Sequence, residues 1–182
     1  NWYYAYGKSS HGEIVSDTRL VASLCEGLDN KPYMVIDDGW QPNMTDAPWD
    51  RGNERFPDMK RLAAEMASAG VRPGIWVRYL INGQNGTRIL GDFPDECYTE
   101  RCSTVLDPSH PLVLDYVRET TSRLVKWGYT LIKHDYSTFD LFGKWGMQIK
   151  CFPAEDDDTW GFYDRGKTSA EIIKGFHRVI RE

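Results

Sequence analysis

Hydrophobic and polar positions along the chain follow two patterns, one typical of short strands and one of amphipathic helices. The strand pattern predicts strands at about residues 2–6, 33–37, 71–78 and 130–135, because each is a short apolar run bounded by turn residues. The helical pattern predicts a helix after each strand, beginning near Asp17, Asp58, Pro111 and Thr168. The chain is therefore expected to repeat a strand and a helix four times.

The first of these helices should place Leu24, Cys25 and Leu28 on one apolar face, so we expect Cys25 to be a buried thiol. In the second, Asp58 is a good N-terminal cap and Gly70 a good terminator. The later two helices should bury one side each, with inward residues Val113, Tyr116, Val117, Thr120, Leu124, Ile172, Ile173, Phe176 and Ile180.

Strands that alternate with helices predict an α/β fold with a parallel sheet. The strand-to-helix connections are long (38–57, 79–110 and 136–167), whereas the helix-to-strand connections are short. This asymmetry is typical of a (β/α)8 TIM barrel, whose site is built from the strand-to-helix loops. Four units make half of such a barrel. We therefore expect residues 1–182 to be its N-terminal half, without a second domain, completed by the rest of a longer chain.

Composition and charge exclude some classes of function. The net charge of −5, with scattered basic residues, argues against a nucleic-acid partner, and no apolar run approaches the roughly 20 residues of a membrane span. Cys97 and Cys102 can close a small disulfide loop, which would favour a secreted or periplasmic protein over a cytoplasmic one. Separate free thiols are an equally good interpretation. No zinc-binding spacing of Cys and His is visible.

Polar side chains recur where the predicted strands end. Strand 33–37 runs into Asp37-Asp38-Gly39-Trp40, strand 71–78 ends with Trp76 and Arg78 on one face, and strand 130–135 ends with Lys133 and Asp135 on one face. A structural ion pair could explain Lys133 and Asp135 alone, and a cap could explain Asp38. The repetition favours a pocket for a small polyol, because carboxylates accept hydroxyl hydrogens while Lys and Arg donate.

Four stretches also resemble a known group of enzymes. "IDDGWQ", "RFPDMKRLAAEMASAGVRPGIWVR", "LDPSHPLVLDYV" and "GYTLIKHDYS" are similar, in this order, to the catalytic barrel of the retaining α-galactosidases of glycoside hydrolase families 27 and 36. The Asp-Asp-Gly-Trp and Lys-x-Asp motifs are the most specific parts of the resemblance.

The resemblance implies a role for each residue at the strand ends. Asp135 would be the catalytic nucleophile and Lys133 would bind a sugar hydroxyl beside it. Asp37 and Asp38 would hold the 4- and 6-hydroxyls of galactose. Trp40 would close that side of the pocket, and the remaining pocket residues would include Trp76 and Arg78. The general acid/base of the family follows the sixth strand and would lie beyond these residues. The loop 136–167, with its acidic run 155–158, would cover the mouth of the barrel.

The expected function is hydrolysis of terminal α-galactosides, in an oligosaccharide or glycoconjugate, through a glycosyl-enzyme intermediate on Asp135 and without a cofactor. Three alternatives remain: an α-N-acetylgalactosaminidase or raffinose-synthase-like transglycosylase with the same pocket, a barrel enzyme that binds Mg²⁺ or Mn²⁺ through Asp37, Asp38 and Asp135, and a non-catalytic sugar-binding segment. Assembly into a homo-oligomer is compatible with the sequence.

Overall fold

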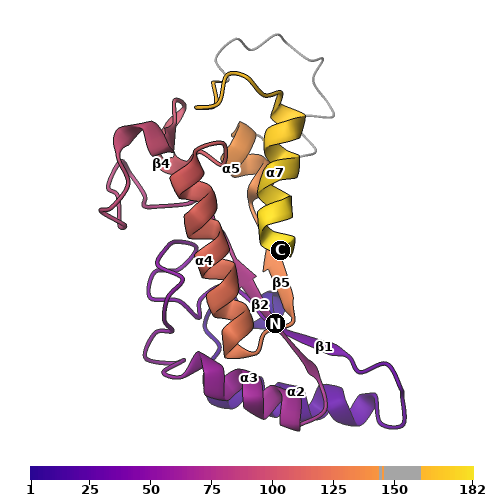
Figure 1. Cartoon of the computed structure of the whole chain (residues 1–182). Coiled ribbons are helices and arrows are strands. Elements are labelled where there is room, and N and C mark those ends of the chain that lie inside the picture. The colour runs from indigo at the N-terminus through magenta and orange to yellow at the C-terminus, as the bar shows by residue number, and fades with distance from the viewer. Residues whose placement is uncertain (144, 146–160) are drawn as a thin grey trace. The chain divides into compact units, whose positions relative to one another are not determined.

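The computed structural model describes residues 1–143, 145 and 161–182 (Figure 1). The acidic run 155–158 and half of the loop 136–167, the expected cover of the mouth, therefore lie outside the described residues. The chain divides into two compact units. The first unit comprises Asn1–Val77 and Thr120–Asp135, and the second comprises Arg78–Glu119 and Tyr136–Glu182.

The first unit contains a three-stranded parallel sheet and the helices beside it. Its elements are α1 (Trp2–Ala5), α2 (His11–Leu24), β1 (Tyr33–Ile36), α3 (Met59–Ser68), β2 (Arg72–Val77), the C-terminal part of α4 (Pro111–Trp127) and β5 (Leu131–His134). The strand order is β1-β2-β5. Helix α2 packs on α3 and β1, and α3 packs on β2 (Figure 1).

The central strand β2 is packed closely between its neighbours β1 and β5. Five of its six residues are buried, as expected for a strand with neighbours on both sides. Gly74 pairs with Val35 on one side and Leu131 on the other. A Cβ atom at Gly74 would lie only 2.9 Å from the Val35 side chain and 3.3 Å from that of Leu131, so glycine leaves room for both neighbouring side chains.

The α/β class and the parallel sheet are confirmed, but the first predicted strand is wrong. Residues 2–5 form the short helix α1, and Tyr3, Tyr4 and Tyr6 are exposed. Aromatic residues favour strands because they pack on a half-buried pleated surface, and these three rings have no such surface to cover. The described residues therefore contribute three strands to the parallel sheet, and the four-unit half-barrel remains a hypothesis.

Helix α2 begins six residues earlier than predicted and turns a different face inward. Ser10 caps it by accepting the backbone N–H of Glu13, and Ile14 and Thr18 are its buried residues. Leu24 and Leu28 are exposed, and Cys25 is half-buried, which corrects the expected apolar face. The sequence Ser-x-x-Glu at residues 10–13 is a capping signature and would have located this start.

Three other helix predictions are confirmed. Asp58 caps α3 by accepting the Arg61 N–H at 2.8 Å. Helix α4 starts at Pro111, with Val113, Val117, Thr120 and Leu124 buried as predicted, whereas Tyr116 is half-buried. Helix α7 (Ser169–Arg181) carries the predicted capping box between Thr168 and Glu171. Its buried residues are Ile172, Phe176 and Val179, so Ile173 and Ile180 are less buried than expected.

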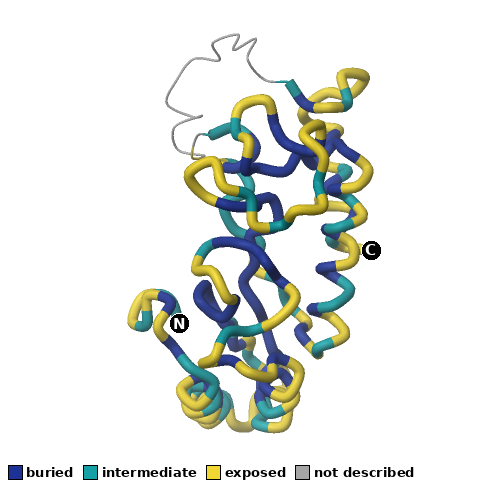
Figure 2. The backbone as a smooth tube through the Cα atoms, turned by 90° about the vertical axis from the view of Figure 1, so that its left-hand side faces the viewer, coloured by how far each residue is buried: buried dark blue, intermediate teal, exposed yellow. Residues whose placement is uncertain are grey.

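The second unit contains an antiparallel pair that the strand pattern did not predict. Its elements, besides the N-terminal part of α4, are the 3-10 helix η1 (Asp95–Cys97), β3 (Tyr98–Thr99), β4 (Cys102–Leu106), α5 (Ser137–Phe142) and α7. Strands β3 and β4 pair antiparallel, and the ring of Tyr79 contacts that of Phe176 on α7 at 6.3 Å between centroids. Figure 2 shows how buried and exposed segments alternate along the chain. No helix in the described ranges is both long enough and apolar enough to span a bilayer.

The suggested disulfide is not formed, because Cys97 and Cys102 are both free thiols. The Cys97 Sγ lies 3.3 Å from His110 Nδ1, and the Cys102 Sγ lies 3.3 Å from the Thr104 hydroxyl. Each thiol thus has a separate polar neighbour. The argument that a disulfide favours an exported protein is removed with it.

Thiol accessibility gives a testable order of alkylation. The Cys97 thiol is fully buried, and this burial raises its pKa. Both its accessibility to a reagent and its thiolate fraction are therefore low. In the native protein, iodoacetamide should modify the half-buried Cys25 and Cys102 at least about tenfold faster than Cys97. Peptide mass spectrometry against time, with a urea-unfolded control, measures this order. Protection of both Cys97 and Cys102 until a reductant is added would show the disulfide instead.

Candidate active site

The sheet register of the first unit brings three of the predicted residues to one level. Ile36 pairs with Ile75, so Asp37 follows β1 at the level of Trp76, and Trp76 itself pairs with Lys133 on β5. Adjacent residues of parallel strands project to the same face of the sheet. Asp37, Trp76 and Lys133 therefore form a row across the C-terminal ends of three neighbouring strands.

An ion pair crosses this row. The Lys133 Nζ donates to Asp37 Oδ2 at 2.7 Å, and the Lys133 side chain is 42% exposed whereas that of Asp37 is 10% exposed. The sequence left open an ion pair between Lys133 and Asp135, its neighbour on the same strand. In the structure the carboxylate that Lys133 binds is that of Asp37, two strands away. The Asp37 carboxylate thus holds the Lys133 ammonium group, while part of the lysine side chain remains exposed to solvent.

Asp135 lies immediately beyond β5 and is oriented from the central strand. Its N–H donates to the Val77 carbonyl at 3.0 Å, which continues the ladder between β2 and β5. Its Oδ2 accepts the Trp76 indole N–H at 3.0 Å. Trp76 is 1% exposed, while Asp135 is half-buried. A rigid donor thus fixes one oxygen of a carboxylate that remains partly open to solvent.

Asp38 occupies a tight polar turn after β1. Its Oδ1 accepts the Gln41 side-chain amide at 2.6 Å and the Thr45 N–H at 2.9 Å, while its own N–H donates to Asp37 Oδ1 at 2.9 Å. Burial raises the pKa of the Asp38 carboxyl, and the charge of Asp37 acts in the same direction, although the hydrogen bonds oppose both. Asp38 is therefore a desolvated carboxyl whose orientation is fixed by its partners.

Gly39 makes this turn possible, and its replacement should destabilise the protein. Its φ is 99°, and a Cβ atom there would lie 2.3 Å from the Gly7 carbonyl oxygen. We expect Gly39→Ala to reduce the free energy of unfolding by roughly 1–3 kcal/mol. Gly12→Ala is the matched control, because Gly12 lies in α2 with open space around it, and alanine should stabilise that helix slightly. Urea unfolding measures both. Equal stability of the two variants would contradict this account of the turn.

Trp40, predicted to close one side of the pocket, is packed among other aromatic side chains. Its side chain is fully buried, and its indole N–H donates to the Trp76 carbonyl at 2.8 Å. Its ring contacts those of Trp49 and Trp127, at 6.1 and 6.2 Å between centroids. Trp49 in turn contacts Trp76 at 5.7 Å. Because the turn after Gly39 directs Trp40 inward, this residue supports Trp76 rather than facing a ligand.

Arg78 belongs to the second unit, and its guanidinium has a structural partner there. It makes a forked ion pair with Asp140, with Arg78 Nε 2.9 Å from one carboxylate oxygen and Nη2 2.5 Å from the other. The side chains are 11% and 1% exposed, respectively. The guanidinium also lies 4.2 Å above the ring centroid of Tyr136. These contacts assign Arg78 a stabilising role that the sequence did not suggest.

Comparison with solved protein structures finds proteins of similar fold. The structural neighbours are glycoside hydrolases. An α-galactosidase from Thermus thermophilus, in complex with p-nitrophenyl α-D-galactopyranoside, matches all of this chain with a TM-score of 0.64 and 19% identity. A family 36 α-galactosidase from Geobacillus stearothermophilus, in complex with stachyose, matches 72% of it with a TM-score of 0.52 and 24% identity. A protein assigned as an α-N-acetylgalactosaminidase from Bacillus halodurans matches 96% with a TM-score of 0.59 and 16% identity.

These likenesses confirm the resemblance found in the sequence at the level of fold. The chain spans 35%, 20% and 43%, respectively, of the three neighbouring chains, so it corresponds to part of each. No protein-family model matches the sequence, and no curated protein sequence matches it either. At these identities the neighbours show a shared fold, and the roles of individual residues rest on the geometry of this chain.

The metal-binding alternative has no support from the described residues. Nowhere in ranges 1–143 and 161–182 do three His, Cys, Asp or Glu side chains gather in an arrangement that could hold a metal ion. The ammonium of Lys133 already occupies Asp37, and Asp38 accepts from an amide and a backbone N–H. The three aspartates proposed as ligands thus serve separate partners.

Sequence reasoning missed three residues that hold the site together. Gln41 and Thr45 fix Asp38, and the Asn1 side chain accepts the Asp37 N–H at 2.9 Å. Gln41 stands within the quoted motif "IDDGWQ", so the motif itself was a signal for it. Thr45 and Asn1 carry no local signal, because their contacts depend on how the loop and the first residues return to the end of β1.

Proposed function

We propose that this chain carries the nucleophile and part of the sugar pocket of a retaining glycosidase that removes terminal α-galactosyl groups. The observation that supports this most directly is the constellation at the ends of β1, β2 and β5. There, a partly open carboxylate, Asp135, is oriented by Trp76, while Asp37 and Lys133 form a pair on the same strand ends. A polyhydroxyl substrate needs both acceptors and donors fixed in this way.

In the proposed reaction, the Asp135 carboxylate attacks the anomeric carbon while the Trp76 indole N–H orients it through Oδ2. The bond to the leaving oxygen breaks, and a second carboxyl group donates the proton to that oxygen. Water then hydrolyses the glycosyl-enzyme ester with help from the same group, and the anomeric configuration is retained. Lys133 donates to a sugar hydroxyl, and the Asp37 and Asp38 carboxylates accept from others. Trp40 acts indirectly, by supporting Trp76.

The expected source of the second carboxyl group depends on which part of the complete barrel this chain would form. Residues 1–182 would form the N-terminal half of a (β/α)8 barrel, and the acid/base would come from a later strand. Within the described residues, β1 and β5 each pair with β2 alone, so each has an edge at which a further barrel strand could pair. Activity is therefore expected of the full-length polypeptide.

A second sugar is the close competitor, because one of the structural neighbours is assigned as an α-N-acetylgalactosaminidase. The two substrates differ at the 2-position, and no residue described here distinguishes them. Comparison of kcat/KM for p-nitrophenyl α-galactoside and its 2-acetamido analogue would decide between them. A preference for the second substrate would assign the other specificity to the same catalytic groups.

The stereochemistry of hydrolysis tests the reaction class. The ¹H NMR spectrum of the first product released from p-nitrophenyl α-galactoside should show α-galactose before mutarotation. A first product with the β configuration would require an inverting mechanism, in which Asp135 is not a nucleophile. Absence of hydrolysis by the full-length, folded polypeptide would reject the glycosidase proposal and favour the sugar-binding alternative.

The raised pKa of Asp38 predicts a pH-dependent stability with a definite sign. A carboxyl whose folded-state pKa is raised stabilises the fold below its ordinary pKa of about 3.9, and this contribution is lost as the pH rises through the folded-state value. Asp38→Asn should therefore gain stability relative to the parent between pH 4 and pH 7, while activity falls by roughly 10–100-fold through loss of a charged acceptor. Urea unfolding at several pH values measures the difference, and a constant difference would contradict the assignment.

A further inference from the structure

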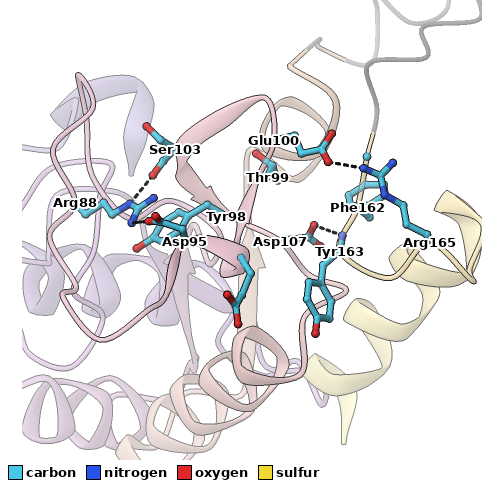
Figure 3. Close-up of a pocket in the computed structure, with 12 residues that line it drawn as sticks. Arg88, Asp95, Tyr98, Thr99, Glu100, Ser103, Asp107, Phe162, Tyr163 and Arg165 are labelled. Atoms are coloured by element: carbon cyan, nitrogen blue, oxygen red, sulfur yellow. Dashed lines mark hydrogen bonds and ion pairs between the residues drawn. The ribbon is translucent and has the colours of Figure 1, made fainter.

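The second unit contains a polar pocket that shares no residue with the strand-end site. Its volume is about 410 Å³, and its walls come from residues 88–107 and from the segment 161–165 (Figure 3). This volume lies within the range of about 300–1,000 Å³ that is typical of small-molecule sites.

The wall formed by segment 161–165 is fixed by a buried carboxylate. Asp107 is 1% exposed, and its Oδ1 accepts both the N–H and the hydroxyl of Ser109, at 2.8 and 2.7 Å. Its Oδ2 accepts the Tyr163 N–H at 2.8 Å. The Ser109 hydroxyl oxygen in turn accepts the Asp164 N–H at 2.9 Å. The pocket is thus formed in advance by hydrogen bonds within the unit.

Two arginine–carboxylate pairs stand on opposite sides of the pocket (Figure 3). On one side the Arg88 guanidinium lies 3.6 Å above the ring centroid of Tyr98 and donates to Asp95 Oδ1 at 2.6 Å. On the other side Arg165 pairs with Glu100. Each pair places a hydrogen-bond donor next to an acceptor. In the second pair, the side chains of Arg165 and Glu100 are both 62% exposed.

The charge of the lining disfavours an anionic ligand. It comprises four carboxylates and two guanidinium groups: Asp95, Glu96, Glu100 and Asp107 with Arg88 and Arg165. An anion would meet an excess of negative charge. Three of the carboxylates already accept from arginine or from the Ser109–Tyr163 network, and the described part of the chain offers no cluster able to hold a metal ion. A neutral ligand rich in hydroxyl groups suits such a lining, because a hydroxyl both donates to carboxylates and accepts from guanidinium groups.

Tyr163 contributes an exposed aromatic ring to the lining of the pocket, beside Tyr98 and Phe162. Its ring is held edge-on by His110, at 4.3 Å between centroids, yet the residue is 53% exposed. A partly exposed aromatic ring can pack against the C–H face of a sugar ring. We propose that this pocket binds a neutral saccharide, as a carbohydrate site formed wholly by residues of the second unit.

Binding to full-length protein tests the inference, by saturation-transfer difference NMR. The probes are stachyose and sucrose, and the Asp135→Asn variant serves as background so that neither sugar is cleaved. We expect Tyr163→Ala to raise the dissociation constant of both sugars about 3–10-fold, and Arg165→Gln to raise it in the same range. Tyr3→Ala, which removes an 89% exposed ring from the first unit, is the control and should change nothing.

The outcomes separate this inference from the proposed function. Tyr163-dependent sugar binding in a protein that cleaves no glycoside would support the pocket and reject the glycosidase. Cleavage of p-nitrophenyl α-galactoside together with unchanged sugar binding in both Tyr163→Ala and Arg165→Gln would reject the pocket alone. The pocket is also rejected if spermidine or inorganic phosphate produces the Tyr163-dependent signal and the neutral sugars do not.

Discussion

Asp135→Gly should lower kcat for p-nitrophenyl α-galactoside by at least about 10⁴-fold, because it removes the atom that forms the covalent intermediate. Sodium azide should restore part of the rate, since a small anion can occupy the space of the lost carboxylate and attack the anomeric carbon. The rescued product should be β-galactosyl azide, which is detectable by NMR. Steady-state kinetics with and without azide measure both effects.

The control for this variant is Asp50→Gly, which removes an exposed aspartate whose ion pair, among the described residues, is with its neighbour Arg51. Its kcat should stay within about twofold of the parent, because exposed ion pairs of this kind contribute about 0–1 kcal/mol. Retention of more than a tenth of the activity in Asp135→Gly would contradict the assignment of the nucleophile. A large loss without azide rescue, in a variant that unfolds like the parent, would favour an orienting role for Asp135.

Arg78→Ala should destabilise the protein by about 3–5 kcal/mol, the usual effect of removing one partner from a buried ion pair. The variant leaves the 1% exposed Asp140 carboxylate without its forked guanidinium partner and uncovers one face of Tyr136. Urea or thermal unfolding measures the loss. Arg78→Lys should recover only part of it, because an ammonium cannot reproduce two parallel hydrogen bonds.

Arg51→Ala is the matched control, since Arg51 is 64% exposed and pairs with the exposed Asp50. It should change the free energy of unfolding by less than about 1 kcal/mol. The pair of variants also separates the two roles considered for Arg78. Unchanged stability with a raised KM would restore the role in substrate binding that the sequence predicted, and would contradict the structural role.

The parts of the fold that the sequence predicted correctly are those with a strong local signal. Asp58 and the Thr168–Glu171 box start helices, and the run "YMVI" forms β1. The errors arise where the local signal depends on packing elsewhere. The aromatic residues at 2–6 have strand propensity but no sheet surface to cover, and β3 is a strand of two residues, too short to show a pattern.

The strand ends show both the reach and the limit of the sequence pattern. Because side chains alternate along a strand, the sequence could place Lys133 and Asp135 on the same face. It could not choose their partners, since these follow from the register between strands. That register puts Lys133 at the level of Asp37, so the ion pair joins these two residues, while Asp135 accepts the indole N–H of Trp76.

Trp40 and Arg78 show a second limit, because both are functional residue types whose surroundings decide their role. Trp40 follows Gly39, whose φ of 99° turns the chain so that the indole is buried. Arg78 meets an aspartate 62 residues further along the chain, a contact with no signature in local sequence. Single residues chosen by type at a strand end therefore need the structure before a role is assigned.

The central claim, that Asp135 forms a covalent bond to the sugar, is tested most directly by trapping the intermediate. The full-length polypeptide would be treated with an activated fluorinated α-galactosyl donor, and then analysed by intact and peptide mass spectrometry. The account predicts one stable glycosyl adduct, located on Asp135 and missing in Asp135→Asn. An adduct on another residue, or none on a folded polypeptide that binds galactose, would contradict it.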